Sequence, residues 1–188
     1  SSAACLSEES MVTQVDLEPS VRDELLSRCT GLSGLIEWLD EIDRRPGLDE
    51  LDHRLRGTSI NLEALRNCIG SADVDYQRNV IKKSEFYELV ANTWKPGQST
   101  PIHDHVGSDC AFLIASGVST ETIHSLDAQG LAVPTRVRTY QRGEVCAADE
   151  PDIHQISNDA ERELINIHIY TPPLNAFNVY EAASGTTA

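Results

Sequence analysis

The most constraining feature of this chain is a change in texture after Tyr76. From there to about residue 178, the sequence runs in short β-branched segments that Gly or Pro interrupts. Turn signals recur roughly every 8–12 residues, which is typical of an all-β sandwich or barrel. The chain is therefore predicted to be mainly β. The predicted strands are 79–81, 86–93, 111–115, 121–125, 135–140, 144–147, 154–157 and 164–170.

The part before this change has a helical pattern. Apolar residues recur at helical spacing, and residues that favour helix starts and stops separate the segments. Helices are predicted from Pro19, from a cap at Ser33 to about Pro46, over Leu48–Leu55, and from Asn61 to Cys68. Residues 1–16 are mostly small and polar and are expected to form a frayed tail. We expect a helical N-terminal part (about 17–70) covering a β-barrel (about 76–178), in a single domain spanning 1–188.

Charge excludes several kinds of partner. The chain has 30 Asp and Glu against 15 Lys and Arg, a net charge of −15. Nucleic acid and anionic membranes both attract cationic surfaces, so neither is expected as a partner. No apolar run approaches the ~18 residues that a membrane span needs.

Cysteine usage and the N-terminus favour a cytoplasmic protein. The five cysteines are scattered and lack a CxxC pair, so we expect reduced thiols. The start of the chain lacks the charged region and apolar stretch of a signal peptide. A cytoplasmic location is therefore expected. The protein is also expected to be a monomer.

The strongest chemical signal is a pair of histidines, His103 and His105. On a strand, residues i and i+2 point to the same side about 6–7 Å apart, so both imidazoles can reach one metal ion. His154 lies in a later strand segment and offers a third imidazole.

These histidines sit in a pattern that resembles the two-motif metal centre of the cupin superfamily, whose fold is a small jelly-roll β-barrel. The matching positions are Gly97, His103, His105, Gly117, Gly143, Pro151, His154 and Asn158. Cys110 occupies the position where ordinary cupins have a glutamate ligand. Three imidazoles alone would leave coordination positions open. Alternatively, Cys110 is a fourth ligand, in a site that resembles structural zinc.

A narrower resemblance is to the cysteine dioxygenase family of thiol dioxygenases, and it covers roughly residues 33–178. Its elements are Tyr76-x-Arg78-Asn79, Trp94, Ile102-His103-Asp104-His105, Cys110, His154 and His168-x-Tyr170-x-Pro172-Pro173. The resemblance implies that ferrous iron, Fe(II), is held by His103, His105 and His154. It also implies oxidation of L-cysteine by O2 to cysteine sulfinic acid, with a small-molecule thiol and O2 as the partners.

The same resemblance implies roles for five further residues. Cys110 and Tyr170 would form a thioether cross-link, and His168 would orient the Tyr170 hydroxyl. Arg78 would bind the substrate carboxylate with Tyr76 nearby. Physical chemistry supports the last assignment, because the planar guanidinium matches a carboxylate. The peptide bond before Pro172 is expected to be cis.

Two departures from the family leave alternatives open. Asn166 stands where the family has the serine that precedes its His-Tyr pair, and its amide is expected to reach toward His168. Gln77 adjoins Arg78, and related 3-mercaptopropionate dioxygenases use Gln at the substrate-binding position. A one-residue shift of register would exchange the two side chains. The alternative functions are a dioxygenase of 3-mercaptopropionate or another small thiol, and a metal-binding cupin without catalysis.

The remaining candidates are expected to be structural. His53 and His124 are predicted at the surface, and Lys82 with Lys83 in a solvated turn. Trp38, Trp94 and Cys146 are predicted in the core, and a buried structural role is the alternative for His168.

Overall fold

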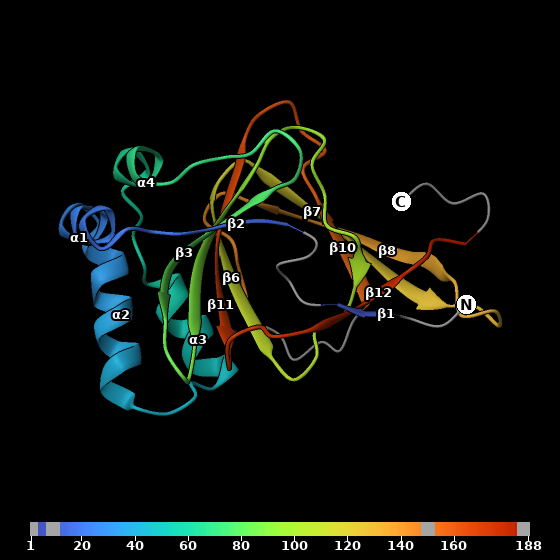
Figure 1. Cartoon of the computed structure of the whole chain (residues 1–188), viewed down its shortest axis with the longest axis horizontal. Coiled ribbons are helices and arrows are strands. Elements are labelled where there is room, and N and C mark those ends of the chain that lie inside the picture. The colour runs from blue at the N-terminus through green and yellow to red at the C-terminus, as the bar shows by residue number, and fades with distance from the viewer. Residues whose placement is uncertain (1–3, 7–11, 148–152, 184–188) are drawn as a thin grey trace.

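The barrel predicted from the sequence is present as two facing six-stranded sheets (Figure 1). The structure is a computed structural model that describes residues 4–6, 12–147 and 153–183. In spatial order, sheet A contains β1 (Ala4–Leu6), β12 (Phe177–Tyr180), β5 (Ile102–His103), β10 (Ile153–Ser157), β7 (Val118–Leu126) and β8 (Ala132–Gln141). Sheet B contains β2 (Thr13–Asp16), β3 (Gln77–Lys83), β4 (Glu88–Trp94), β11 (Leu164–Thr171), β6 (Asp109–Ser116) and β9 (Val145–Cys146).

Among the described residues, four helices lie between β2 and β3 in the chain and beside sheet B (Figure 1). They are α1 (Pro19–Arg28), α2 (Thr30–Ile42), α3 (Leu48–Arg56) and α4 (Leu62–Cys68). The predicted start of α4 is confirmed: the Asn61 side chain caps it by accepting a hydrogen bond from the Ala64 amide at 3.1 Å. Ser33 is not a cap as predicted: α2 begins at Thr30, and Ser33 lies inside it, donating to the Leu26 carbonyl at 2.7 Å.

The central strands of sheet B are buried on both faces, including their polar residues. Every residue of β4 and β11 is buried. Alternate residues of β11 (Ile165, Ile167 and Ile169) join the main hydrophobic core with the helices. The residues between them, including His168 and Tyr170, therefore face the barrel interior.

The N-terminal segment is not a frayed tail over all of residues 1–16, as we predicted from its composition. β1 pairs with β12, and β2 pairs in parallel with β3. Residues 1–3 and 7–11 lie outside the described residues. The short strands form because partners far along the chain supply their backbone hydrogen bonds, which local composition does not reveal.

Two other surface predictions are wrong. His124 is only 5% exposed, because β7 is flanked by β10 on one side and β8 on the other. Lys82 is part of β3 and pairs with Asp40 of α2 at 2.9 Å, so it does not lie in a turn. His53 is exposed as predicted. Trp38 and Trp94 are buried as predicted.

Asn158 and Gly97 of the cupin pattern connect two loops by hydrogen bonds. Asn158 is fully buried, and its side chain donates to the Trp94 and Arg162 carbonyls at 2.9 and 2.7 Å. Its backbone carbonyl accepts from Gly97 N at 2.8 Å, which ties the end of β10 to the loop after β4. Pro151 lies outside the described residues.

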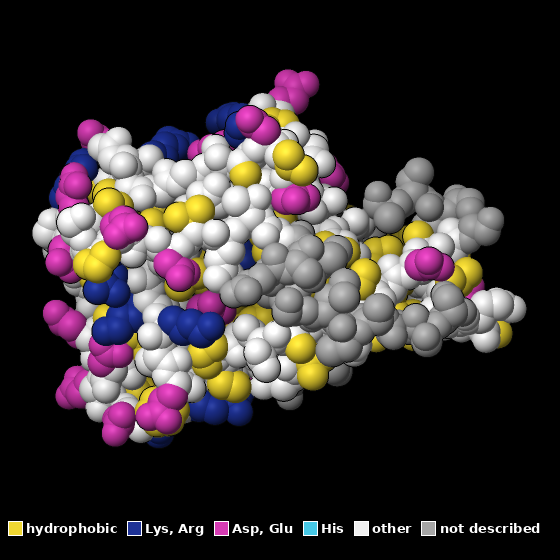
Figure 2. All heavy atoms as spheres, in the orientation of Figure 1, with side chains coloured by type: hydrophobic (Ala, Val, Ile, Leu, Met, Phe, Trp, Pro, Cys, Tyr) yellow, Lys and Arg dark blue, Asp and Glu magenta, His cyan; other side chains and the backbone are white. Residues whose placement is uncertain are grey.

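Acidic side chains are spread over the helical end and the loops, with Lys and Arg between them (Figure 2). None of the described helices is long and apolar enough to cross a membrane.

Gly117 lies in the turn between β6 and β7, where the backbone at Glu163 passes close to it. Its φ is +84°, and a Cβ there would lie 2.5 Å from the Glu163 carbonyl oxygen. We expect Gly117→Ala to lower the free energy of unfolding by more than about 2 kcal/mol, since backbone strain adds to a clash with backbone. Urea denaturation measures the loss.

Gly143→Ala is the matched control, because Gly143 also has a positive φ of +89° but nothing within 4 Å of its Cβ position. It should lose only the ~1–2 kcal/mol of conformational strain. Equal losses in the two variants would contradict the close approach at Gly117.

Candidate metal centre

Three histidines converge inside the barrel, from two strands of sheet A. His103 ends β5, and His154 of β10 is its direct partner in the antiparallel register. The two-residue period of a strand predicted that His105 would share a strand with His103. His105 instead lies beyond the end of β5. The local turn nevertheless brings it in, and one ligand atom from each of the three residues lies within 4.8 Å of the others.

Hydrogen bonds to the ring nitrogens aim two of these imidazoles. The Nδ1 of His103 lies 2.8 Å from the Pro101 carbonyl, and the Nδ1 of His154 lies 2.9 Å from Oε2 of Glu121. A ring whose Nδ1 carries the proton offers the lone pair of Nε2. The Nε2 of His154 is buried with no hydrogen-bond partner among the described residues, as expected of a metal ligand.

The imidazoles of His103 and His105 are neutral, which is the state that metal binding needs. Burial, with His154 close by, lowers the pKa of His103 to about 3. Burial likewise holds the pKa of His105 well below its usual value, with His103 as the next cause. Neutral imidazoles are ligands for iron, zinc and copper, so the donor set fits a transition metal with open positions.

Asp104, between the two histidines of the motif, fixes the loop that carries them. Its carboxylate accepts from the Asn178 backbone at 3.0 Å and from the Tyr180 hydroxyl at 2.8 Å. These bonds fasten the His103–His105 turn to β12, a strand that the sequence did not predict. The sequence did not predict supporting roles for Glu121 and Asp104. The feature that points to them is an acidic residue at, or next to, a strand position that faces the barrel interior.

Sheet B supplies the opposite wall of the site. Tyr170 and Cys110 are direct partners in the pairing of β11 with β6. The Nδ1 of His168 lies 3.4 Å from the Cys110 sulfur and 3.4 Å from the Tyr170 hydroxyl. The Tyr170 ring lies edge-on to His105, with centroids 5.6 Å apart. The structure therefore brings Cys110, His168 and Tyr170 together beside the histidine cluster.

Cys110 is not part of the histidine cluster. Among the described residues, the group with metal-ligand spacing contains His103, His105 and His154 only. Burial, followed by the neighbouring Cys146, raises the pKa of the Cys110 thiol. A protonated thiol pointing at His168 does not support the alternative of a fourth, zinc-type ligand.

Arg78 faces the site and Gln77 faces away from it. The Arg78 guanidinium lies 5.7 Å from the centre of the Tyr170 ring. Gln77 instead donates to Asn79 at 2.8 Å and lies against Gly70, on the helix side of the sheet. This register is the one that favours Arg78.

The Arg78 side chain has protein partners that the sequence did not predict. It forms a buried ion pair with Glu88 at 2.8 Å, with both side chains at most 2% exposed, and it also bonds to Gln14. The sequence feature that points to Glu88 is a charged residue within the predicted strand 86–93. Glu88 is two residues from Val90, so both side chains point to the same face of the strand.

Tyr76 and Asn166 both contact Trp94. Tyr76 stacks on Trp94, with ring centroids 4.0 Å apart. The Asn166 side chain accepts from the Trp94 indole at 3.3 Å, and among the described residues no bond joins it to His168. Both residues support Trp94 behind the site. The peptide bond before Pro172 is cis, as predicted.

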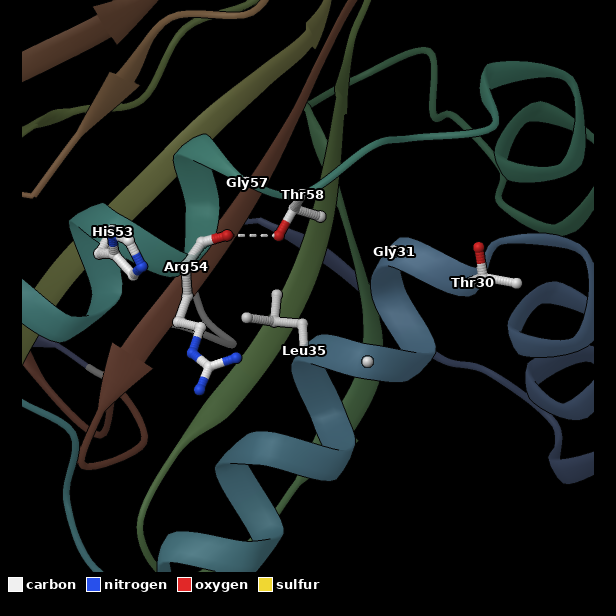
Figure 3. Close-up of a pocket in the computed structure, with 8 residues that line it drawn as sticks. Thr30, Gly31, Leu35, His53, Arg54, Gly57 and Thr58 are labelled. Atoms are coloured by element: carbon white, nitrogen blue, oxygen red, sulfur yellow. Dashed lines mark hydrogen bonds between the residues drawn. The ribbon is translucent and has the colours of Figure 1, made fainter.

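A separate surface pocket lies between α2 and α3 (Figure 3). Thr30 and Leu35 line it from α2, and His53 and Arg54 from α3. None of the residues predicted for the metal site lines this pocket.

The fold is that of the cupin superfamily. A crystal structure of a Klebsiella pneumoniae protein with a double-stranded β-helix domain matches with a TM-score of 0.51 at 16% identity. The match covers 62% of this chain and 88% of that one. The predicted cupin barrel with a helical cap is therefore confirmed.

Sequence relatives identify the family. Cysteine dioxygenase type 1 of Homo sapiens is 24% identical over 115 residues, which cover 58% of this chain and 58% of the human protein. The Danio rerio protein of the same name is 24% identical over 147 residues, 68% of this chain and 73% of that protein. The model of the family "Cysteine dioxygenase type I" matches residues 71–183. The chain therefore belongs to the cysteine dioxygenase type I family.

Proposed function

We propose that the protein is a non-haem Fe(II) dioxygenase that oxidises L-cysteine to cysteine sulfinic acid. The observation that carries the proposal is the set of three imidazoles with metal-ligand spacing, beside a Tyr170 side chain that His168 and Arg78 adjoin. Oxygenases need open coordination positions, and a three-histidine set without a carboxylate provides them. The names of the relatives point to the same substrate.

Ferrous iron, when bound, supplies a site at which the substrate sulfur and O2 meet. Both atoms of O2 are transferred to the sulfur, which loses four electrons, so the thiol becomes a sulfinic acid without another reductant. His103, His105 and His154 hold the metal, while Glu121 and the Pro101 carbonyl fix the ring orientations.

Tyr170 and His168 provide a proton-holding pair. Burial, with the Arg78 charge as the second cause, lowers the pKa of His168 to about 3, so its ring is neutral. A neutral ring can accept a hydrogen bond from the Tyr170 hydroxyl at Nδ1, which keeps the hydroxyl oriented. Cys110 lies against the same nitrogen, where a thioether to Tyr170 would fix both residues.

Arg78 is the proposed partner of the substrate carboxylate, and Tyr76 supports this wall through Trp94. The alternative substrate is 3-mercaptopropionate, which has the carboxylate but lacks the amine. The alternative function is metal binding without catalysis. A monomeric state, a single domain and a cytoplasmic location stay predictions.

Oxygen uptake tests the activity directly. Protein loaded anaerobically with Fe(II) and then given L-cysteine and air should form sulfinate and consume O2 in a one-to-one ratio. An oxygen electrode and mass spectrometry measure the two quantities, and His103→Ala is the control without the metal site. The proposal fails if no small thiol, including 3-mercaptopropionate and cysteamine, promotes O2 uptake.

Glu121 tests the metal site independently of turnover. We expect Glu121→Gln to weaken Fe(II) binding about 10–100-fold, because the amide holds the His154 ring less firmly than a carboxylate does. Competition with a chelator measures the affinity. Glu85→Gln, on an exposed residue, makes the same chemical change outside the site and should leave the affinity unchanged.

The cross-link can be tested on a denaturing gel. Protein that has turned over should run as two bands, because a thioether between Cys110 and Tyr170 closes a loop and makes the chain more compact. Cys110→Ser should give one band, and Cys146→Ser should keep both. A single band of uncross-linked mass in the wild type after turnover would remove the cross-link while leaving the dioxygenase proposal in place.

A further inference from the structure

His168 and Asn92 each carry a buried polar atom that has no hydrogen-bond partner among the described residues. The two atoms are Nε2 of His168 and Oδ1 of Asn92, on residues that are 7% and 2% exposed. Leaving a buried polar atom without a hydrogen bond costs free energy, so most such atoms bind a water molecule or a ligand. The proposed reaction assigns no task to either atom.

The pairing register places the two residues on the same wall of the barrel. Asn92 of β4 is the direct partner of Asn166, and His168 is the next residue of β11 on that face. Asn92 is therefore the diagonal neighbour of His168, at a separation of ~7–8 Å in a sheet. Two polar side chains at this separation can both bond to one water molecule.

The neighbours of Asn92 in the sheet have other partners. Asn166 accepts a hydrogen bond from the Trp94 indole at 3.3 Å. Arg78, the direct partner of Asn92 on β3, forms an ion pair with Glu88 at 2.8 Å. The amide oxygen of Asn92 bonds to neither neighbour.

The contacts of the other ring nitrogen decide where the His168 proton lies. Nδ1 faces two groups that can donate, the Cys110 thiol and the Tyr170 hydroxyl, each at 3.4 Å. Burial lowers the pKa of His168 to about 3, so the ring is neutral and carries one proton. When Nδ1 accepts, that proton lies on Nε2. Nε2–H is then a buried donor, and the Asn92 oxygen is a buried acceptor.

We propose that Asn92 is a positioning residue for the Tyr170–His168 pair and that it acts through one buried water molecule. Nε2–H of His168 donates to the water, and the water donates to Oδ1 of Asn92. This connection holds the proton on Nε2, so Nδ1 stays an acceptor for the Tyr170 hydroxyl. Asn92 thus supplies the support that the sequence predicted from Asn166. The inference rests on the proposed function only for what Tyr170 does in the reaction.

Nitrogen NMR measures the tautomer of His168 without turnover. The protein is grown with isotope-labelled histidine and loaded with Zn(II), which is diamagnetic and also suits imidazole ligands. His168→Gln identifies the His168 signals by their loss. We expect a protonated Nε2 and an unprotonated Nδ1. A proton on Nδ1 in the wild type would overturn the proposal.

Variants of Asn92 test whether this residue holds the proton in place. Asn92→Leu removes the amide and keeps the branched shape, and the share of the Nδ1-protonated tautomer should rise at least about tenfold. Asn92→Asp keeps an oxygen at the same position and should retain the proton on Nε2. If Asn92→Leu lowers the Tm or the zinc content, Asn92→Val replaces it as the apolar variant.

Thr93→Val is the matched control on the same strand. It removes a buried hydroxyl that donates to the Gly70 carbonyl at 2.6 Å, on the helix side of β4. This change should leave the His168 tautomer and kcat as in the wild type. A general loosening of β4 would affect this control as much as the Asn92 variants.

Kinetics with L-cysteine give a second readout. Asn92→Leu should lower kcat about tenfold and change KM less than about twofold, because the amide acts on the Tyr170–His168 pair and not on the substrate. A raised KM with a wild-type kcat and tautomer would overturn the proposal and make Asn92 a substrate contact.

The outcomes separate this inference from the proposed function. A wild-type tautomer in the folded apolar variant would overturn the inference and leave the dioxygenase proposal in place. If the wild type oxidises no small thiol, the proposed function fails. The NMR spectra of the zinc-loaded proteins would still decide whether Asn92 holds the His168 proton in that case.

Discussion

The structure depends on one constraint, which is that sheet B is covered on both faces. β11 shows it most directly: Ile165, Ile167 and Ile169 pack against the helical core, while His168 and Tyr170 face the barrel interior. The two-residue period of a strand allows one segment to serve both faces. The helices are therefore more than a covering. By burying the outer face they exclude water from behind the wall of the site, so the inward polar groups lie in a region of low dielectric.

Most polar groups buried around the site have a protein partner, although Asn92 Oδ1 and His168 Nε2 form no hydrogen bond within the described residues. Arg78 pairs with Glu88, His154 bonds to Glu121, and His168 lies between Cys110 and Tyr170. Burial keeps the imidazoles of His103 and His105 neutral, since a charged ring there would lose its hydration. The three histidines are thus placed to bind a metal ion, and the Glu88 carboxylate balances the charge of Arg78. Preparing the ligands and holding them in place is the protein's contribution to the chemistry.

The sequence predicted the parts of this arrangement that local patterns encode. Strand segments from 79 to 170 were located because their composition and turn signals are local, and the motif around His103 identified the metal site. β2 and β12 were missed because pairing with distant strands stabilises them. His124 is buried although it was predicted at the surface, and its place in the interior strand β7, between β10 and β8, is a matter of long-range pairing. The role of Glu88 was not predicted, since it depends on the guanidinium of Arg78, which lies ten residues earlier in the chain and whose partner on β4, Asn92, is four residues from Glu88.

Two electrostatic effects on the substrate act in the same direction and can be distinguished by range. The net charge of −15 repels anionic thiols from the whole surface. Glu88 repels them inside the cavity, beside Arg78. Salt screens surface charges beyond about 8–10 Å at physiological ionic strength, whereas a buried pair is screened much less. Discrimination against anions that persists in high salt therefore comes from the buried carboxylate, and discrimination that salt removes comes from the acidic surface.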